Sequence, residues 1–303
     1  MISKILVPTD GSERAKETCR YAITLSKQTN ATIRLLSVVN DDEVTNTARL
    51  IEAVGKTKSV VEEHYRKVAE EYVEELKGMC EKSNVSVETA ISSGYPSQEI
   101  AKDAKESGAD LIIMGAHGRR ALLTTVLGSV TNNVISMKID IPVLVVRHGS
   151  AINLISKILV PTDGSEIAEK AARYAVDLAK QVGASVIVLS VVDKPTAVTQ
   201  AFPIFEAAPE TIRSIEIGLR KAAENYVENI KSLCDKNGVH GWTVIREGHI
   251  VDEIAKEIEK DRPNLIIMGS RGRSALKAAV LGSVTTGVIH KQSEVPVLVV
   301  SAQ

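Results

Sequence analysis

The stretch SKILVPTDGSE runs from Ser3 to Glu13 and returns, letter for letter, from Ser156 to Glu166. In both copies a short apolar run, KILV, ends at a proline, and this pattern is typical of a buried strand. Apolar side chains then recur near helical spacing over residues 13–28, after Asp10 and Ser12, either of which can cap a helix. Each copy therefore predicts a strand followed by a turn and a helix.

The repeat extends over the whole chain. A shift of 153 or 154 residues also aligns the following blocks: RYA at 20 and 173, LSVV at 36 and 189, LIIMG at 111 and 265, LGSVT at 127 and 281, and PVLVV at 142 and 296. The blocks keep their order and nearly their spacing, so the two halves should share one fold. We expect two domains, residues 1–149 and 150–303, joined by a short segment at about 147–155.

Apolar runs and helical patterns alternate along each half. In the first half we expect strands at 4–8, 32–39, 85–91, 111–114 and 143–146, and helices at 13–28, 60–81, from 96 and at 129–137. This alternation predicts an α/β fold with two tandem Rossmann-like domains, each an open five-stranded, mainly parallel sheet with helices on both faces. The stretches 40–57 and 193–209 do not match each other, and we expect them to be loops at the mouth of a site.

Composition excludes several classes of protein. Hydrophobic residues make up 44% of the chain but aromatic residues only 3%, a mixture expected of buried parallel strands. The net charge of −1 argues against a protein that coats nucleic acid or membrane. Cys19, Cys80 and Cys234 are far apart and odd in number, which predicts a reducing compartment without a disulfide framework. With no signal peptide and no bilayer-spanning apolar run, we expect a soluble cytoplasmic protein.

A glycine pattern occurs twice between a strand and a helix. GAHGRRALLTTVLGS begins at Gly115 and GSRGRSALKAAVLGS at Gly269, so both have the form G-x2-G-x9-G-S. Gly115 and Gly118 permit positive φ and let a ligand approach the backbone without meeting a Cβ. Gly128 and Ser129 should open a helix whose free N–H groups attract an anion, with Ser129 either capping that helix or facing a phosphate.

The charges around these glycines agree with an anion site. No acidic residue occurs between Asp110 and Asp140 or between Asp261 and Glu294. The same windows contain the basic residues Arg119, Arg120, Lys138, Arg271, Arg273 and Lys277. The pattern predicts a polyphosphate cradle in each half, and the alternative is a set of tight turns with a solvated basic loop.

Asp10 at the end of the first strand, together with G-x2-G-x9-G-S, resembles the ATP-binding branch of the universal stress protein family over nearly the entire chain. The resemblance implies a stress-response regulator that binds ATP, ADP or AMP in each half, often with Mg²⁺ near Asp10 and Asp163. In the first half it implies contacts from Pro8, Thr9 and Asp10 to the nucleoside, from the Val38 backbone to adenine, and from Met114, Gly115, Gly118, Arg119, Gly128, Ser129 and Val130 to ribose and phosphates. The equivalent residues of the second half are Pro161, Thr162, Asp163, Val191, Met268, Gly269, Gly272, Arg273, Gly282, Ser283 and Val284.

The sequence assigns no catalytic residue. A Walker A pattern is absent, and His117 has Arg271 as its counterpart in the second half. Asp10 and Asp163 are the only repeated candidates for a general base. A slow ATP hydrolase or an AMP-forming enzyme of the nucleotide α-hydrolase-like group is therefore the alternative, and an interaction module without ligand turnover is the second.

Each half ends in the strand PVLVV, whose position predicts a sheet edge open to pairing. Single domains of the family that this chain resembles dimerise through that strand. We therefore expect the two halves to pack as a pseudo-twofold pair through these strands. The sequence does not decide whether whole chains also form homo-oligomers.

Overall fold

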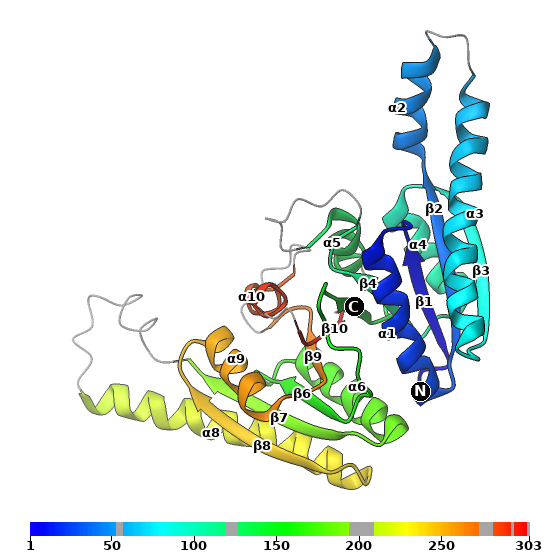
Figure 1. Cartoon of the computed structure of the whole chain (residues 1–303). Coiled ribbons are helices and arrows are strands. Elements are labelled where there is room, and N and C mark those ends of the chain that lie inside the picture. The colour runs from blue at the N-terminus through cyan, green and yellow to red at the C-terminus, as the bar shows by residue number, and fades with distance from the viewer. Residues whose placement is uncertain are drawn as a thin grey trace.

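The computed structural model describes residues 1–52, 57–118, 127–137, 139–193, 209–272, 281–291 and 294–301, and it confirms the α/β fold (Figure 1). The first half contains β1 (Lys4–Thr9), α1 (Glu13–Thr29), β2 (Thr32–Asn40), α2 (Asp41–Glu52), α3 (Lys58–Lys82), β3 (Val87–Gly94), α4 (Pro96–Glu106), β4 (Leu111–Gly115), α5 (Ser129–Ser136) and β5 (Val143–Val146). The second half contains β6 (Lys157–Pro161), α6 (Glu166–Val182), β7 (Ser185–Val192), α8 (Pro209–Lys236), β8 (Gly241–Glu247), α9 (Ile250–Asp261), β9 (Leu265–Gly269), α10 (Ser283–Lys291) and β10 (Val297–Val300).

The repeated opening builds the same unit twice. Ile5, Leu6 and Val7 of β1 are fully buried, as expected for a strand covered on both faces. Ser12 is the residue that caps α1, because its Oγ accepts the Ala15 N–H at 3.2 Å. Ser165 caps α6 in the same way.

The expected loop at 40–57 is wrong over residues 41–52, which form α2. Three acidic residues occupy its first turn, where they favour a helix N-terminus. Val44, Ala48 and Ile51 follow at helical spacing and pack with Tyr65 of α3. The pair α2 and α3 extends well beyond the sheet (Figure 1). In the second half, residues 194–208 of the expected loop lie outside the described residues.

The described strands form one ten-stranded sheet in the order β3-β2-β1-β4-β5-β10-β9-β6-β7-β8. All pairs within a half are parallel, and β5 and β10 pair antiparallel, with Val145 opposite Val297 and Leu144 opposite Leu298. The halves are thus joined through their last strands, as the pattern predicts. One apolar core on each face of the sheet includes residues of both halves.

Two glutamines make reciprocal contacts between the halves. Gln28 of α1 accepts the Ile155 N–H at 2.7 Å and donates to the Ile155 carbonyl at 3.1 Å. Gln181 of α6 makes the same pair of bonds to Ile2, at 2.8 Å each. Each amide side chain therefore satisfies the backbone just before the first strand of the other half.

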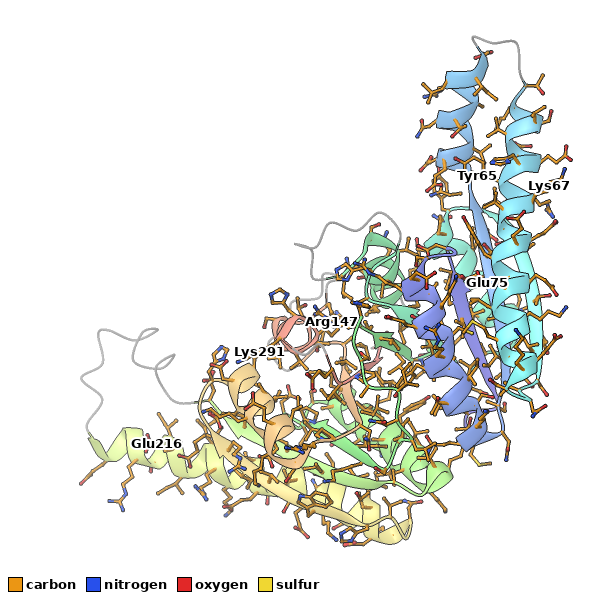
Figure 2. All side chains as sticks on the ribbon, in the orientation of Figure 1. Tyr65, Lys67, Glu75, Arg147, Glu216 and Lys291 are labelled. Atoms are coloured by element: carbon orange, nitrogen blue, oxygen red, sulfur yellow. The ribbon has the colours of Figure 1, made fainter. Side chains whose placement is uncertain are left out.

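The segment between β5 and β6 is short and tied down, and the expected domain boundary at residues 149–150 lies within it. The Ala151 N–H donates to the Glu294 carbonyl at 3.0 Å. Arg147 lies beside α10 (Figure 2), where its guanidinium donates to the carbonyls of Ile289 and His290 in the last turn of that helix. None of the helices in the described part of the chain is long and apolar enough to cross a bilayer.

We predict that Gln181→Ala lowers the free energy of unfolding by about 1–3 kcal/mol, because it leaves two backbone groups of Ile2 without their partners. Gln28→Ala should have a similar cost. Gln98→Ala, on the exposed face of α4, is the control and should be nearly neutral. Urea titration measures all three, and equal midpoints for the three variants would contradict the reciprocal contact.

Candidate functional site

A cavity of about 940 Å³ opens at the carboxyl ends of the strands in the first half. After β1 the chain adds β2 and then β3 on one side of β1, whereas β4 and then β5 lie on its other side. The strand order therefore reverses between β1 and β4. Open α/β sheets form their ligand crevice at this reversal, because the flanking connections run to opposite sides. The cavity volume lies within the range of small-molecule sites.

The structure brings most of the predicted first-half residues together around this cavity. Ten of the eleven line it: Pro8, Thr9, Asp10, Val38, Met114, Gly115, Gly118, Gly128, Ser129 and Val130. The eleventh, Arg119, lies outside the described residues. Four other basic residues near the two glycine patterns also lie outside them: Arg120, Lys138, Arg273 and Lys277.

Asp10 is held by its own turn and faces the glycine loop. Its Oδ1 accepts the Ser12 N–H at 3.1 Å and the Ser12 hydroxyl at 2.6 Å. Its Oδ2 is so close to Gly118 that a Cβ added there would lie only 2.7 Å away. A side chain at Gly118 would therefore displace the carboxylate.

The second half repeats this arrangement. Asp163 Oδ1 accepts from Ser165 at the same two distances, 3.1 and 2.6 Å. A Cβ added at Gly272 would lie 2.6 Å from Asp163 Oδ2. Both halves thus place one carboxylate against the second glycine of the loop.

Gly115 and Gly118 do not adopt the positive φ that a glycine permits. Neither glycine has a φ in the left-handed region, and the glycines that do include Gly11 at +74° and Gly164 at +73° in the turns after β1 and β6. Residue 118 has to be a glycine because the Asp10 carboxylate leaves no room for a Cβ. The backbone position that adopts a positive φ, and so favours glycine, is therefore in the repeated T-D-G-S turn.

Gly128 has no such structural reason. Its φ of −63° and ψ of 150° suit any residue, and a Cβ added there would meet no described atom closer than 3.4 Å. It is the N-cap of α5, which no side chain among the described residues caps, so Ser129 does not serve as the cap. The unpaired N–H groups and positive dipole end of α5 open onto the cavity through Ser129 and Val130.

Two hydrogen bonds hold the start of α5 against the end of β4. The Gly128 N–H donates to the Ala116 carbonyl at 2.7 Å, and Thr131 Oγ1 donates to the Gly115 carbonyl at 2.8 Å. In the second half Gly282 and Thr285 make the equivalent bonds, each at 2.8 Å. The helix N-terminus is therefore a rigid part of the site in both halves.

A comparison with known proteins identifies the family. A model of the universal stress protein family matches residues 1–147 and again residues 155–301. The chain belongs to the universal stress protein family. A universal stress protein of Methanocaldococcus jannaschii is 35% identical over 156 residues, which are 52% of this chain and 86% of that protein.

Other relatives span the tandem arrangement. A universal stress protein of Mycobacterium tuberculosis is 25% identical over 305 residues, covering 97% of this chain and 96% of its own length. The crystal structure of a universal stress protein from Archaeoglobus fulgidus matches 98% of this chain and 96% of its own with a TM-score of 0.69, at 23% identity. The latter likeness supports the fold of this universal stress protein.

The repeat does not mark Arg14, because an arginine occurs at this position in one half only. Arg14 of α1 donates to the Gly118 carbonyl at 3.4 Å and so brings a cation to the glycine loop. Its counterpart in the second half is Ile167. Comparison of the two halves for differences, as well as for matches, could have found it.

The sequence pattern also did not predict that α2 and α3 form one wall of the cavity. Glu43, His64, Tyr65 and Tyr72 line the cavity of this universal stress protein. The Tyr65 hydroxyl lies 3.0 Å from Thr47 Oγ1, so the side chain bridges α3 to α2 (Figure 2). At the positions of His64 and Tyr65 the second half has Gly218 and Leu219. The second half therefore lacks these two aromatic side chains at the equivalent positions.

Tyr72 also covers the turn after β1. A Cβ added at Gly11 would lie 2.3 Å from its ring. The same pair recurs as Gly164 and Tyr226. The two tyrosines are 154 positions apart, which is the spacing of the repeat, so the sequence alone could have identified them.

We predict that Gly11→Ala costs about 1–3 kcal/mol more stability than Gly108→Ala. Both glycines have similar φ, +74° and +69°, but a Cβ at Gly108 meets nothing within 4 Å. Gly108→Ala therefore measures only the cost of a left-handed alanine, about 1–2 kcal/mol. Urea unfolding provides both values. Equal costs, or an undiminished cost of Gly11→Ala in a Tyr72→Ala background, would show that the ring does not constrain the turn.

Proposed function

We propose that this universal stress protein binds an adenine nucleotide, with ATP as the preferred ligand, in the cavity of the first half and at the equivalent edge of the second. The observation that carries the proposal is Gly128. A glycine that neither its backbone conformation nor its packing requires lies at an uncapped helix N-terminus that opens onto a cavity. A ligand that must touch the backbone explains it.

Phosphates fit this end of the cavity. The free N–H groups at the start of α5 supply donors, and the helix dipole favours negative charge. Arg14 adds a cation next to Gly118, and Gly118 itself belongs to the sequence window between Asp110 and Asp140 that contains no acidic residue. By its position after β4, Arg119 would add a second, and Arg273 would do so in the second half.

The base fits at the end of β2. Thr32 donates its N–H to Ser3 on the β1 side, whereas Ile33 donates to Ser86 on the β3 side. By this alternation the N–H and C=O of Val38 point toward β1, beside its last residue, Thr9, whose register partner is Ser37. The Val38 backbone would therefore hydrogen-bond an adenine edge, between apolar walls that include Met114 and Ile100. Val191 would do the same in the second half.

Asp10 and Asp163 fit a site that contains Mg²⁺ or a ribose hydroxyl. A carboxylate beside a polyphosphate is repulsive unless a cation or a hydroxyl lies between them. The described residues contain no group of three or more metal-ligating side chains, so the phosphates would provide most of the ligands to Mg²⁺. Bound Mg²⁺ would neutralise phosphate charge, and Ser12 and Ser165 would hold the two carboxylates in place.

These features favour a regulatory role, in which the protein responds to whether a nucleotide is bound. The repeated residues orient a nucleotide and balance its charge, and the repeated carboxylates are already engaged by their turns. We therefore place this chain among stress-response regulators that read adenine nucleotide levels, with little or no fast turnover.

We predict that isothermal titration with ATP and Mg²⁺ gives two sites per chain, of unequal affinity because the walls differ at His64 and Tyr65. A stoichiometry of one would restrict the proposal to one half. Absence of heat and of retained nucleotide, for ATP, ADP and AMP alike, would overturn it.

We predict that Gly128→Ala weakens the first site by about tenfold or more, which corresponds to about 1.4 kcal/mol. The fold should be unchanged because the added Cβ has room. Gly282→Ala should weaken the second site instead. The control is Gly78→Ala on α3, where a Cβ meets nothing within 4 Å and no phosphate is expected. Unchanged affinity in both loop variants would remove the assigned role of these glycines.

A further inference from the structure

Two buried thiols meet between α1 and α3. Cys19 Sγ and Cys80 Sγ are 3.9 Å apart, although the residues are 61 positions apart in the sequence. Both are fully buried in the core on that face of the sheet. Lys16 and Glu75 join the same two helices with an ion pair of 2.6 Å, and Glu75 points from α3 toward α1 (Figure 2). The two helices are therefore held in a fixed relation around the thiol pair.

We propose that Cys19 and Cys80 are a redox modification site that forms a reversible disulfide within the first half. A disulfide requires its sulfur atoms at about 2.05 Å. From a contact of 3.9 Å, the two sulfur atoms have to approach by about a further 1.9 Å to form the bond. A reversible bond also agrees with the reducing compartment that the cysteine count predicts, where disulfides are transient.

The second half provides an internal control. Cys234 of α8 corresponds to Cys80 and is likewise fully buried, but the position of Cys19 is taken by Ala172 on α6. The repeated frame therefore tolerates alanine at this site and does not require a cysteine pair for packing. The dithiol is a property of the first half.

The environment assigns different roles to the two sulfurs. The contact with Cys19, in which either sulfur can donate, lowers the pKa of Cys80, whereas the contact with Cys80 and burial raise the pKa of Cys19. Cys80 is also in the last turn of α3, which ends at Lys82, and helix ends open more easily than helix centres. We therefore assign Cys80 as the sulfur that reacts first with an oxidant, when the end of α3 opens and exposes it.

With hydrogen peroxide as the oxidant the step balances. The Cys80 thiolate attacks one peroxide oxygen, the O–O bond breaks, and hydroxide leaves as water after taking a proton, so Cys80 becomes a sulfenic acid. The Cys19 sulfur then attacks the Cys80 sulfur, the S–O bond breaks, and a second water leaves with the Cys19 proton. Two thiols and one peroxide give one disulfide and two waters, and a small thiol reverses the product by exchange.

The bond would fix the two helices that shape the cavity wall. α1 begins at the turn of Asp10, and α3 contributes Tyr72, which covers that turn. A cross-link between residues 61 positions apart restricts the unfolded chain, and the oxidised protein should unfold at a higher temperature. This inference does not depend on nucleotide binding.

Peptide mapping of the full chain tests the proposal. Native reduced protein is treated with hydrogen peroxide, denatured in iodoacetamide and digested. We expect a cross-linked pair of peptides containing Cys19 and Cys80, with Cys234 alkylated, and dithiothreitol should restore three alkylated cysteines. The melting temperature of the oxidised protein should rise by about 5 °C or more.

The matched variant is Cys19→Ala, which copies the arrangement of the second half. It should form no cross-link and show no rise in melting temperature with peroxide. Alkylation of both Cys19 and Cys80 in the peroxide-treated wild type, or conversion of Cys80 to sulfinic acid without a cross-link, would overturn the proposal whatever the variant does.

Discussion

The antiparallel ladder between β5 and β10 is the contact on which the rest of the architecture depends. Each of these strands is the last of its half and would otherwise expose unpaired N–H and C=O groups along a row of valines and leucines. Pairing removes both edges at once. It also makes the core on each face continuous across the halves, so that Leu144 and Leu298 lie in one cluster and Val145 and Val297 in the other.

The direction of this ladder separates the two sites. Within each half all strands are parallel, so their carboxyl ends meet at one edge, and the reversal at β5 and β10 turns the second half around. The carboxyl ends of β1 and β6 therefore lie at opposite edges of the sheet. Communication between the sites has to pass through contacts between the halves. Arg147 is such a contact, because it binds the last turn of α10, the helix that begins just after Gly282.

The two halves share a common frame and differ in the side chains around it. The turns of Asp10 and Asp163 agree to a tenth of an ångström. The residues that differ, Arg14, Tyr65 and Cys19, are on helices that cover the first site, and Ile167, Leu219 and Ala172 replace them in the second half. The frame is determined by backbone hydrogen bonds and strand packing, which tolerate such exchanges without loss of the fold.

The sequence by itself determined the order of strands and helices, the two halves and the family. These properties are encoded locally, in apolar periodicity, in a proline after a strand and in glycines at fixed spacing, and a repeat displays each of them twice. The same local rules failed at α2, because an acidic first turn with few apolar residues becomes a helix only when α3 is beside it. Only the tertiary structure showed that Asp10 lies against Gly118, that positive φ belongs to Gly11, and that Cys19 meets Cys80. The first and the last are contacts between residues far apart in the chain, and the packing of helices on the sheet, which no local pattern specifies, decides which of them form.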